Sequence, residues 1–270
     1  MLYLSIVKFS IVFTMRNLLV ILLLISIIGS FGCSSKKGDD PTEGWSASRI
    51  YNTAKNYLDS GNYEDAVKYF EALEARYPFG RFAEQAQLEI AYAYYKYEEP
   101  DLAIAAADRF IRLHPRHKNV AYAYYIKGLA NFNRGHGMLD KYMARDYSEN
   151  DAKPLIQSYQ DFSSIVSRYP NSRYAQDARD HLAHLRNLLA NHELHVANYY
   201  MRRKAYLAAA RRSEYIIEHY QGSETIPDAL VIMYKAYKEL GLDDLSQDSL
   251  RVLKLNFPGK AAELEKKNKS

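Results

Sequence analysis

The stretch AKNYLDSGNYEDAVKYFEALEARYP, residues 54–78, decides the fold class because its spacing of residue types recurs along the chain. A small residue is followed by Tyr three positions later, by Ala nine positions further and by Pro twelve positions beyond. The five recurrences, with departures in the later ones, are Ala54, Tyr57, Ala66 and Pro78; Ala91, Tyr94, Ala103 and Pro115; Gly128, Ser158, Phe162, Ile165 and Pro170; Ala197, Tyr200, Ala209 and Gln221; and Tyr234, Tyr237, Ser246 and Pro258. Such a repeat predicts helix pairs that bury their apolar faces against their neighbours.

This pattern resembles the tetratricopeptide repeat. Its small residue lets the second helix approach the first closely, and the Tyr and aliphatic residues fill the seam between them. We therefore expect an all-α fold, a right-handed solenoid of five tetratricopeptide-like helix pairs with a concave inner face. The solenoid is expected to occupy residues 45–258 and to be followed by a charged C-terminal tail at 259–270.

Two of the repeats are longer than the basic unit of 37 residues. The third carries 18 extra residues, an insert at about 132–154, and the fourth carries 14. Fourteen residues make about four helical turns, so an insert inside one helix keeps the faces of that helix in register. Because no Gly or Pro occurs between Tyr174 and Lys204, we expect a single long helix there.

Residues 1–32 have the pattern of a signal peptide. The eleven residues from Leu18 to Ile28 contain one polar side chain, Ser26, and are preceded by Met15-Arg16. A membrane-spanning helix needs about 20 apolar residues, so this run is too short to be one. We expect translation to begin at Met15, which gives the peptide a short basic start.

The chain has a single cysteine, Cys33, directly after the signal peptide. The sequence Ser30-Phe31-Gly32-Cys33 resembles a bacterial lipobox, although Leu is more usual at the position of Ser30. The resemblance implies lipidation of Cys33, and the alternative is a chance cysteine. Ser34 in place of Asp implies the outer membrane rather than the inner one. Residues 33–44 are too polar to bury apolar area and are expected to form a flexible tether.

Composition excludes several functional classes. With 48% hydrophobic and 25% charged residues, the chain is ordinary globular material. Its 36 basic and 32 acidic residues nearly balance, which argues against a dedicated nucleic-acid binder. One cysteine cannot form an intrachain disulfide or a multi-cysteine metal site. No phosphate-binding loop, nucleophile elbow or paired-carboxylate site is recognisable, so we expect no enzymatic activity and no cofactor.

The first helices of repeats one to three carry aromatic residues away from the expected seam. A solvent-facing helix would normally present Glu and Lys, so these residues predict a peptide-binding groove. The alternative is packing of the rings against an N-terminal cap or a neighbour. The predicted groove residues are Tyr51, Lys55, Leu58, Leu88, Tyr92, Tyr95, Lys96, Tyr122, Tyr125 and Phe132.

Three further stretches make a more specific resemblance. Residues 131–137 (NFNRGHG), 168–175 (RYPNSRYA) and 193–203 (ELHVANYYMRR) resemble the BamD family, tetratricopeptide lipoproteins of the outer-membrane β-barrel assembly machine. The resemblance covers residues 33 to about 258. It departs from the family at Lys204, where Gly is usual in the turn, and at Gln221, where Pro would close the repeat.

The resemblance implies a lipid-anchored adaptor at the outer membrane that faces the periplasm. Such a protein would bind incoming outer-membrane proteins by their C-terminal β-signal and dock on the barrel-forming subunit, and other lipoproteins could join. Tyr and Phe rings would receive the aromatic end of the signal, and Lys55 or Lys96 its carboxylate. Arg211 and Arg212 are the predicted docking residues, with a pair of solvated arginines as the alternative. The other functional hypothesis is a different lipid-anchored periplasmic tetratricopeptide scaffold of the cell envelope.

Four histidines, His181, His184, His192 and His195, share one face of the expected long helix. The pair three residues apart could hold one metal ion, but no carboxylate or cysteine convincingly completes either pair. We therefore interpret the histidines as a polar interface or a solvated face and predict no metal site.

Overall fold

The computed structural model describes residues 41–134 and 152–269, which contain helices and turns but no strand. The expected signal peptide, Cys33 and most of the tether lie outside these residues, as does most of the insert at 132–154. Residues from Ser46 onwards form one compact unit.

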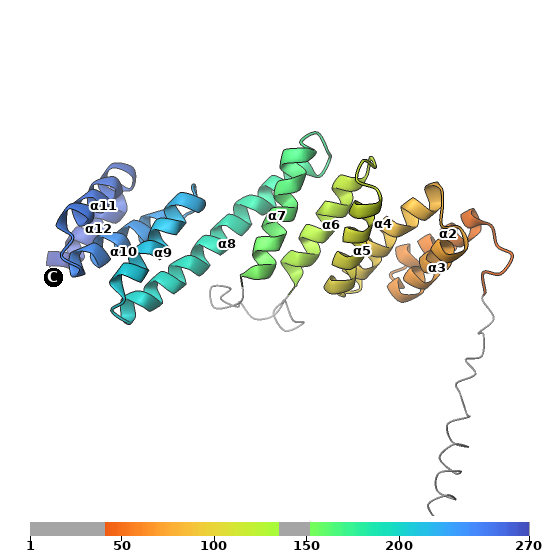
Figure 1. Ribbon diagram of the computed structural model, residues 1–270, viewed down its shortest axis with the longest axis horizontal. Coiled ribbons are helices and arrows are strands. Elements are labelled where there is room, and N and C mark those ends of the chain that lie inside the picture. The colour runs from red at the N-terminus through yellow and green to blue at the C-terminus, as the bar shows by residue number, and fades with distance from the viewer. Residues whose placement is uncertain (1–40, 135–151, 270) are drawn as a thin grey trace, which may run out of the picture. The chain divides into compact units, whose positions relative to one another are not determined.

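Within residues 46–134 and 152–269, the helices are arranged as five antiparallel pairs and one added helix (Figure 1). Each helix packs against the next one along the chain, and successive first helices also touch in several repeats. This arrangement confirms the predicted all-α solenoid of five tetratricopeptide-like helix pairs. The pairs are α2 (Ala47–Asp59) with α3 (Tyr63–Arg76), α4 (Arg81–Lys96) with α5 (Pro100–Leu113), α6 (Val120–Asn133) with α7 (Lys153–Arg168), α8 (Ala175–Arg202) with α9 (Tyr206–His219), and α10 (Ile226–Glu239) with α11 (Asp243–Asn256); α12 (Pro258–Lys269) follows.

The repeat pattern positions its small residues in the seams between helices. Ala54, Ala91 and Ala197 are completely buried, as the repeat predicted. Gly128 has the same role in repeat three, where a Cβ atom would lie 3.0 Å from the ring of Phe162. A larger residue would therefore require the Phe162 ring to shift, which favours glycine where α6 approaches α7. Ser158 donates a hydrogen bond of 2.9 Å to the Gly128 carbonyl.

The predicted long helix is present as α8, which runs without interruption from Ala175 to Arg202. The turn after it contains Lys204, whose φ of 58° lies in the left-handed region that favours glycine. The corresponding turns of repeats one and five use Gly61 and Gly241, with φ of 82° and 71°. The chain thus keeps the turn geometry at Lys204 without the glycine that usually supplies it.

Most of the residues expected to form a charged tail, 259–270, belong to a helix, α12, which the sequence analysis did not predict. Ala261 and Leu264, three residues apart, are buried beside Leu253 and Tyr234 of the last helix pair. Lys260 also pairs with Asp228 of α10 at 2.8 Å. An open end of a repeat array exposes apolar surface, and α12 covers it as a capping helix.

Candidate functional site

Most of the predicted groove residues come together on one face of α2, α4 and α6, the first helices of repeats one to three. Their rings are partly buried, and several rest on a shared core formed by Ala91, Ala107 and Ile126. We call this set the tyrosine face. It consists of Tyr51, Lys55, Tyr92, Tyr95, Lys96, Tyr122, Tyr125 and Phe132.

Two predicted groove residues do not belong to the tyrosine face. Leu58 and Leu88 are only 4% and 1% exposed, and Leu88 packs against Phe110 in the core. Each lies three or four residues from the buried alanine of its helix, which places it on nearly the same side as that alanine. Tyrosines at the same spacing are long enough to keep their hydroxyls at the surface, whereas leucines are not.

An acidic residue that the sequence interpretation missed, Glu89 of α4, lies at the N-terminal end of the tyrosine face. Its carboxylate accepts hydrogen bonds from the Tyr51 hydroxyl at 3.4 Å and the Gln85 amide at 3.1 Å. Lys55 Nζ lies 3.6 Å from the same carboxylate and 3.3 Å from Asp59. The charge of Lys55 is therefore already neutralised. Glu89 precedes Tyr92 by three residues, so helical spacing from the tyrosines could have identified it.

The start of α8 extends the tyrosine face into repeat four. The ring of Tyr174, which immediately precedes α8, stacks on Tyr125 and on Tyr122, with centroid distances of 4.9 and 5.3 Å. The Tyr125 hydroxyl donates a hydrogen bond of 2.7 Å to Asp177. Neither Tyr174 nor Asp177 was predicted, because the length of the insert hides the register between α6 and α8.

Burial raises the pKa of three tyrosines of this face. It raises the pKa of Tyr51 to about 12, with a further contribution from the nearby charge of Glu89. Burial also raises the pKa of Tyr122 and of Tyr125 well above the ordinary tyrosine value, and the hydrogen bond to Asp177 adds to the effect at Tyr125. These three rings are therefore neutral at physiological pH, and the hydroxyls of Tyr51 and Tyr125 donate to Glu89 and Asp177.

Two of the four histidines of α8, His181 and His184, make aromatic contacts at this end of the face. The ring of His181 stacks on Phe162 at 4.5 Å, and the rings of His181 and His184 both contact Phe132. His181 Nε2 also lies 3.4 Å from Asp177. Within residues 41–134 and 152–269, no three His, Cys, Asp or Glu side chains are placed to share a metal ion.

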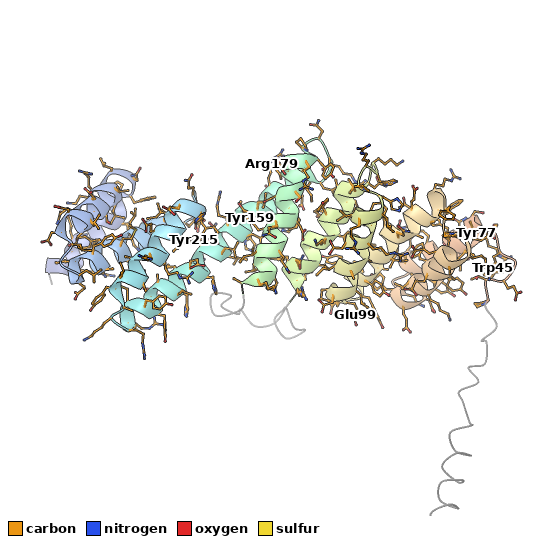
Figure 2. All side chains as sticks on the ribbon, in the orientation of Figure 1. Trp45, Tyr77, Glu99, Tyr159, Arg179 and Tyr215 are labelled. Atoms are coloured by element: carbon orange, nitrogen blue, oxygen red, sulfur yellow. The ribbon has the colours of Figure 1, made fainter. Side chains whose placement is uncertain are left out.

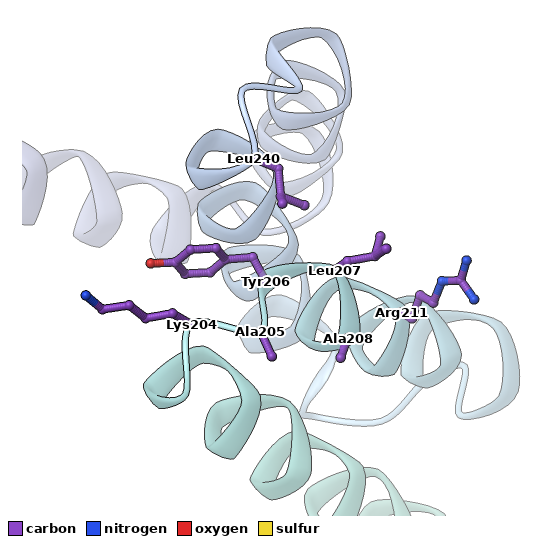
Figure 3. A pocket seen from close by; sticks show the side chains of 7 residues that line it. All are labelled: Lys204, Ala205, Tyr206, Leu207, Ala208, Arg211 and Leu240. Atoms are coloured by element: carbon purple, nitrogen blue, oxygen red, sulfur yellow. The ribbon is translucent and has the colours of Figure 1, made fainter.

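The two predicted docking arginines point in different directions on α9. Arg212 Nη1 pairs with Glu193 of α8 at 3.0 Å. Arg211 instead lines a shallow hollow beside the turn between α8 and α9, together with Leu207 and Leu240 (Figure 3). The side chains of Leu207 and Leu240 are 52% and 39% exposed, which is high for leucine. We call this surface the C-terminal hollow; its lining residues are Lys204, Ala205, Tyr206, Leu207, Ala208, Arg211 and Leu240.

Comparison with known proteins identifies the family. Residues 44–253 match a family model, YfiO, described as an outer membrane lipoprotein. The outer membrane protein assembly factor BamD of Neisseria meningitidis serogroup B is 46% identical over 217 residues, which cover 80% of this chain and 81% of that protein. The chain belongs to the BamD family.

Other BamD family members match over similar or greater lengths. The BamD proteins of Xylella fastidiosa strain 9a5c and of Vibrio cholerae are 39% and 35% identical, and their alignments cover 91% and 87% of this chain. The same alignments cover 84% and 96% of those relatives, so the match to the BamD family includes nearly the whole helical unit. No helix in the described parts of the chain has the length and hydropathy needed to span a membrane.

Proposed function

We propose that this chain is a non-enzymatic lipoprotein adaptor of the β-barrel assembly machinery. It would bind incoming outer-membrane proteins, dock on the barrel-forming subunit and so promote insertion of those proteins into the outer membrane. Membership of the BamD family, whose curated members are named outer membrane protein assembly factors, is the observation that carries the proposal. Lipidation at Cys33 would hold the protein at the outer membrane, with the helical unit in the periplasm.

The tyrosine face is the proposed client site. A β-signal is an extended segment with alternating apolar side chains that often ends in an aromatic residue with a free carboxylate. The partly buried rings of Tyr92, Tyr95 and Tyr125 offer flat apolar contacts, and the hydroxyls of Tyr92 and Tyr95 can donate hydrogen bonds to an extended backbone. Lys55 is neutralised by Glu89 and Asp59, so we assign the carboxylate to Lys96. Lys96 is exposed and has no carboxylate at ion-pair distance among the described residues.

Replacing Tyr92 and Tyr95 by Ala is expected to weaken binding of a C-terminal β-signal peptide by about 1–3 kcal/mol, because two aromatic anchors are removed. Fluorescence anisotropy with a labelled peptide measures the change. Tyr199→Ala with Tyr215→Ala is the matched control, since both of these rings are exposed on α8 and α9, away from the tyrosine face. Equal affinities of the two double variants for the peptide, with the helical circular dichroism spectrum retained, would show that the client site is not on the tyrosine face.

A further inference from the structure

In the first repeats of this solenoid, the turns that join repeats and the turns within repeats carry opposite charges. The turn within repeat four, with Arg202, Arg203 and Lys204, does not follow this pattern. The first three turns that join one repeat to the next, residues 75–82, 111–119 and 166–176, contain no Asp or Glu, whereas the fourth, residues 220–225, contains Glu224. The turns within repeats one and two, residues 59–65 and 96–101, carry six acidic residues and one Lys. The basic residues of the joining turns are Arg76, Arg81, Arg112, Arg116, Lys118, Arg168 and Arg173.

Topology places these joining turns along one edge. Each helix pair returns the chain to the side on which it began, so the turns between repeats lie on one edge and those within repeats on the other. Figure 1 shows the α5–α6 and α7–α8 turns along the upper edge and the α8–α9 turn along the lower one. In Figure 2, Arg179 near the start of α8 and Glu99 before α5 mark these opposite edges. We call the first three joining turns the basic edge.

The charge of the middle turn of the basic edge is uncompensated within the described residues. Arg112, Arg116 and Lys118 are exposed, and within the described residues no carboxylate lies at ion-pair distance from them. Arg81 stacks over the ring of Phe82, and Arg168 contacts the Tyr124 hydroxyl, so both keep their positive charge without an acidic partner. Two nearby acids are already paired, since Glu74 lies against Arg109 and Glu84 against His117.

Apolar side chains project from the same edge. Phe79, in the first joining turn, is 91% exposed, and Leu113, at the end of α5, is 57% exposed. Exposed rings and leucines between unpaired cations are typical of surfaces that meet lipid headgroups, where the cations face phosphates and the apolar groups enter the interface.

We propose that the basic edge binds anionic phospholipid headgroups and holds the solenoid against the membrane surface, in addition to any lipid anchor. This interaction uses neither the tyrosine face nor the C-terminal hollow, and it is independent of client binding. Each Lys or Arg near an anionic membrane raises the binding constant about fivefold. Removing the three cations of the turn at 111–119 should therefore lower the binding constant about 100-fold.

Co-sedimentation with vesicles tests the proposal. The protein is the chain from residue 33 with Cys33→Ser, which contains the whole compact unit from Ser46 onwards and lacks acyl chains. Vesicles contain equal amounts of phosphatidylglycerol and phosphatidylethanolamine, and control vesicles contain phosphatidylcholine. The edge variant is Arg112→Gln, Arg116→Gln and Lys118→Gln. The matched control, Arg202→Gln, Arg203→Gln and Lys204→Gln, removes the same charge from exposed positions on the opposite edge.

We expect the Cys33→Ser chain to bind the anionic vesicles, to bind them more weakly as the salt concentration is raised, and not to bind phosphatidylcholine vesicles. The edge variant should bind about 100-fold more weakly and the control variant within about threefold of the parent chain. Equal losses in both variants would show a nonspecific effect of net charge and overturn the proposal. Absence of vesicle binding would also overturn it, and edge-dependent binding of polyglutamate in that case would assign the surface to an acidic protein instead.

Discussion

Replacing Lys127 by Met is expected to lower the free energy of unfolding by about 3–5 kcal/mol, because it leaves a buried carboxylate without its counter-charge. Lys127 Nζ lies 3.2 Å from Asp161 of α7 and 2.8 Å from Asp108 of α5, so it links three consecutive helices. Asp161 is only 5% exposed, and its other oxygen accepts a hydrogen bond of 2.8 Å from the Asn131 amide. Urea unfolding followed by circular dichroism measures the loss.

Two further variants test whether the loss of stability comes from the unpaired charge of Asp161. Asp108 has a side chain that is 35% exposed, so Asp108→Asn should cost less than about 1 kcal/mol. Lys127→Met combined with Asp161→Leu should recover most of the stability, because replacing both members of a buried pair removes the unpaired charge. Similar losses for Lys127→Met and Asp108→Asn would contradict the assignment of Lys127 as the counter-charge of a buried acid.

The same site predicts a pH dependence. Burial raises the pKa of Asp161 above the ordinary Asp value, even though Lys127 and Asn131 oppose the shift. Lys127→Met removes the main opposing charge and should raise that pKa further. A carboxyl whose pKa is higher in the folded state gains relative stability as pH falls through that value. The difference in free energy of unfolding between the parent chain and Lys127→Met should therefore become smaller as pH is lowered.

Replacing Arg212 by Glu is expected to abolish co-purification of the barrel-forming subunit and to leave binding of the β-signal peptide intact. Charge reversal inside a contact converts attraction into repulsion, and Arg is enriched among interface anchors. The tyrosine face belongs to repeats one to three and the start of α8, so peptide binding serves as an internal control for folding. Quantitative recovery from solubilised membranes, at matched expression and low salt, measures the effect.

The ion pair of Arg212 with Glu193 requires an additional variant, because Arg212→Glu also places two carboxylates together within the chain. The exchange Arg212→Glu with Glu193→Arg restores that pair and should still fail to recover the subunit. Recovery by the exchange variant would mean that Arg212 acts only through Glu193. Loss of the subunit with Arg211→Glu alone would place docking at the C-terminal hollow, which Arg211 lines.

The sequence pattern predicted the helix pairs because their determinants are local. Small residues at fixed spacing permit close approach, and the absence of Gly or Pro from 174 to 204 predicted a helix that the structure bounds at Ala175 and Arg202. The helical end of the chain was missed because its charged residues outnumber its apolar ones. The spacing of Ala261 and Leu264 was the available signal, and it shows one buried stripe on an otherwise polar helix.

The candidate site was less predictable because it depends on contacts between repeats. Lys55 was expected to be available to a carboxylate, but Glu89 comes from the next repeat and neutralises it. The stacking of Tyr174 on Tyr125 joins residues on either side of the insert, whose length obscures their register. Leu58 was wrongly included in the groove for a different reason. Helical spacing places it near the buried side of α2, and the packed structure shows that a leucine there does not reach the surface.

Isolation of the unsubstituted chain from solubilised outer membranes, with identification of the proteins that accompany it, tests the central claim most directly. An adaptor of β-barrel assembly should be recovered with the barrel-forming subunit and, after brief crosslinking, with precursor outer-membrane proteins joined to the tyrosine face. Recovery of the folded chain alone, or only with envelope proteins that have no part in barrel insertion, would contradict the account and favour a different periplasmic scaffold.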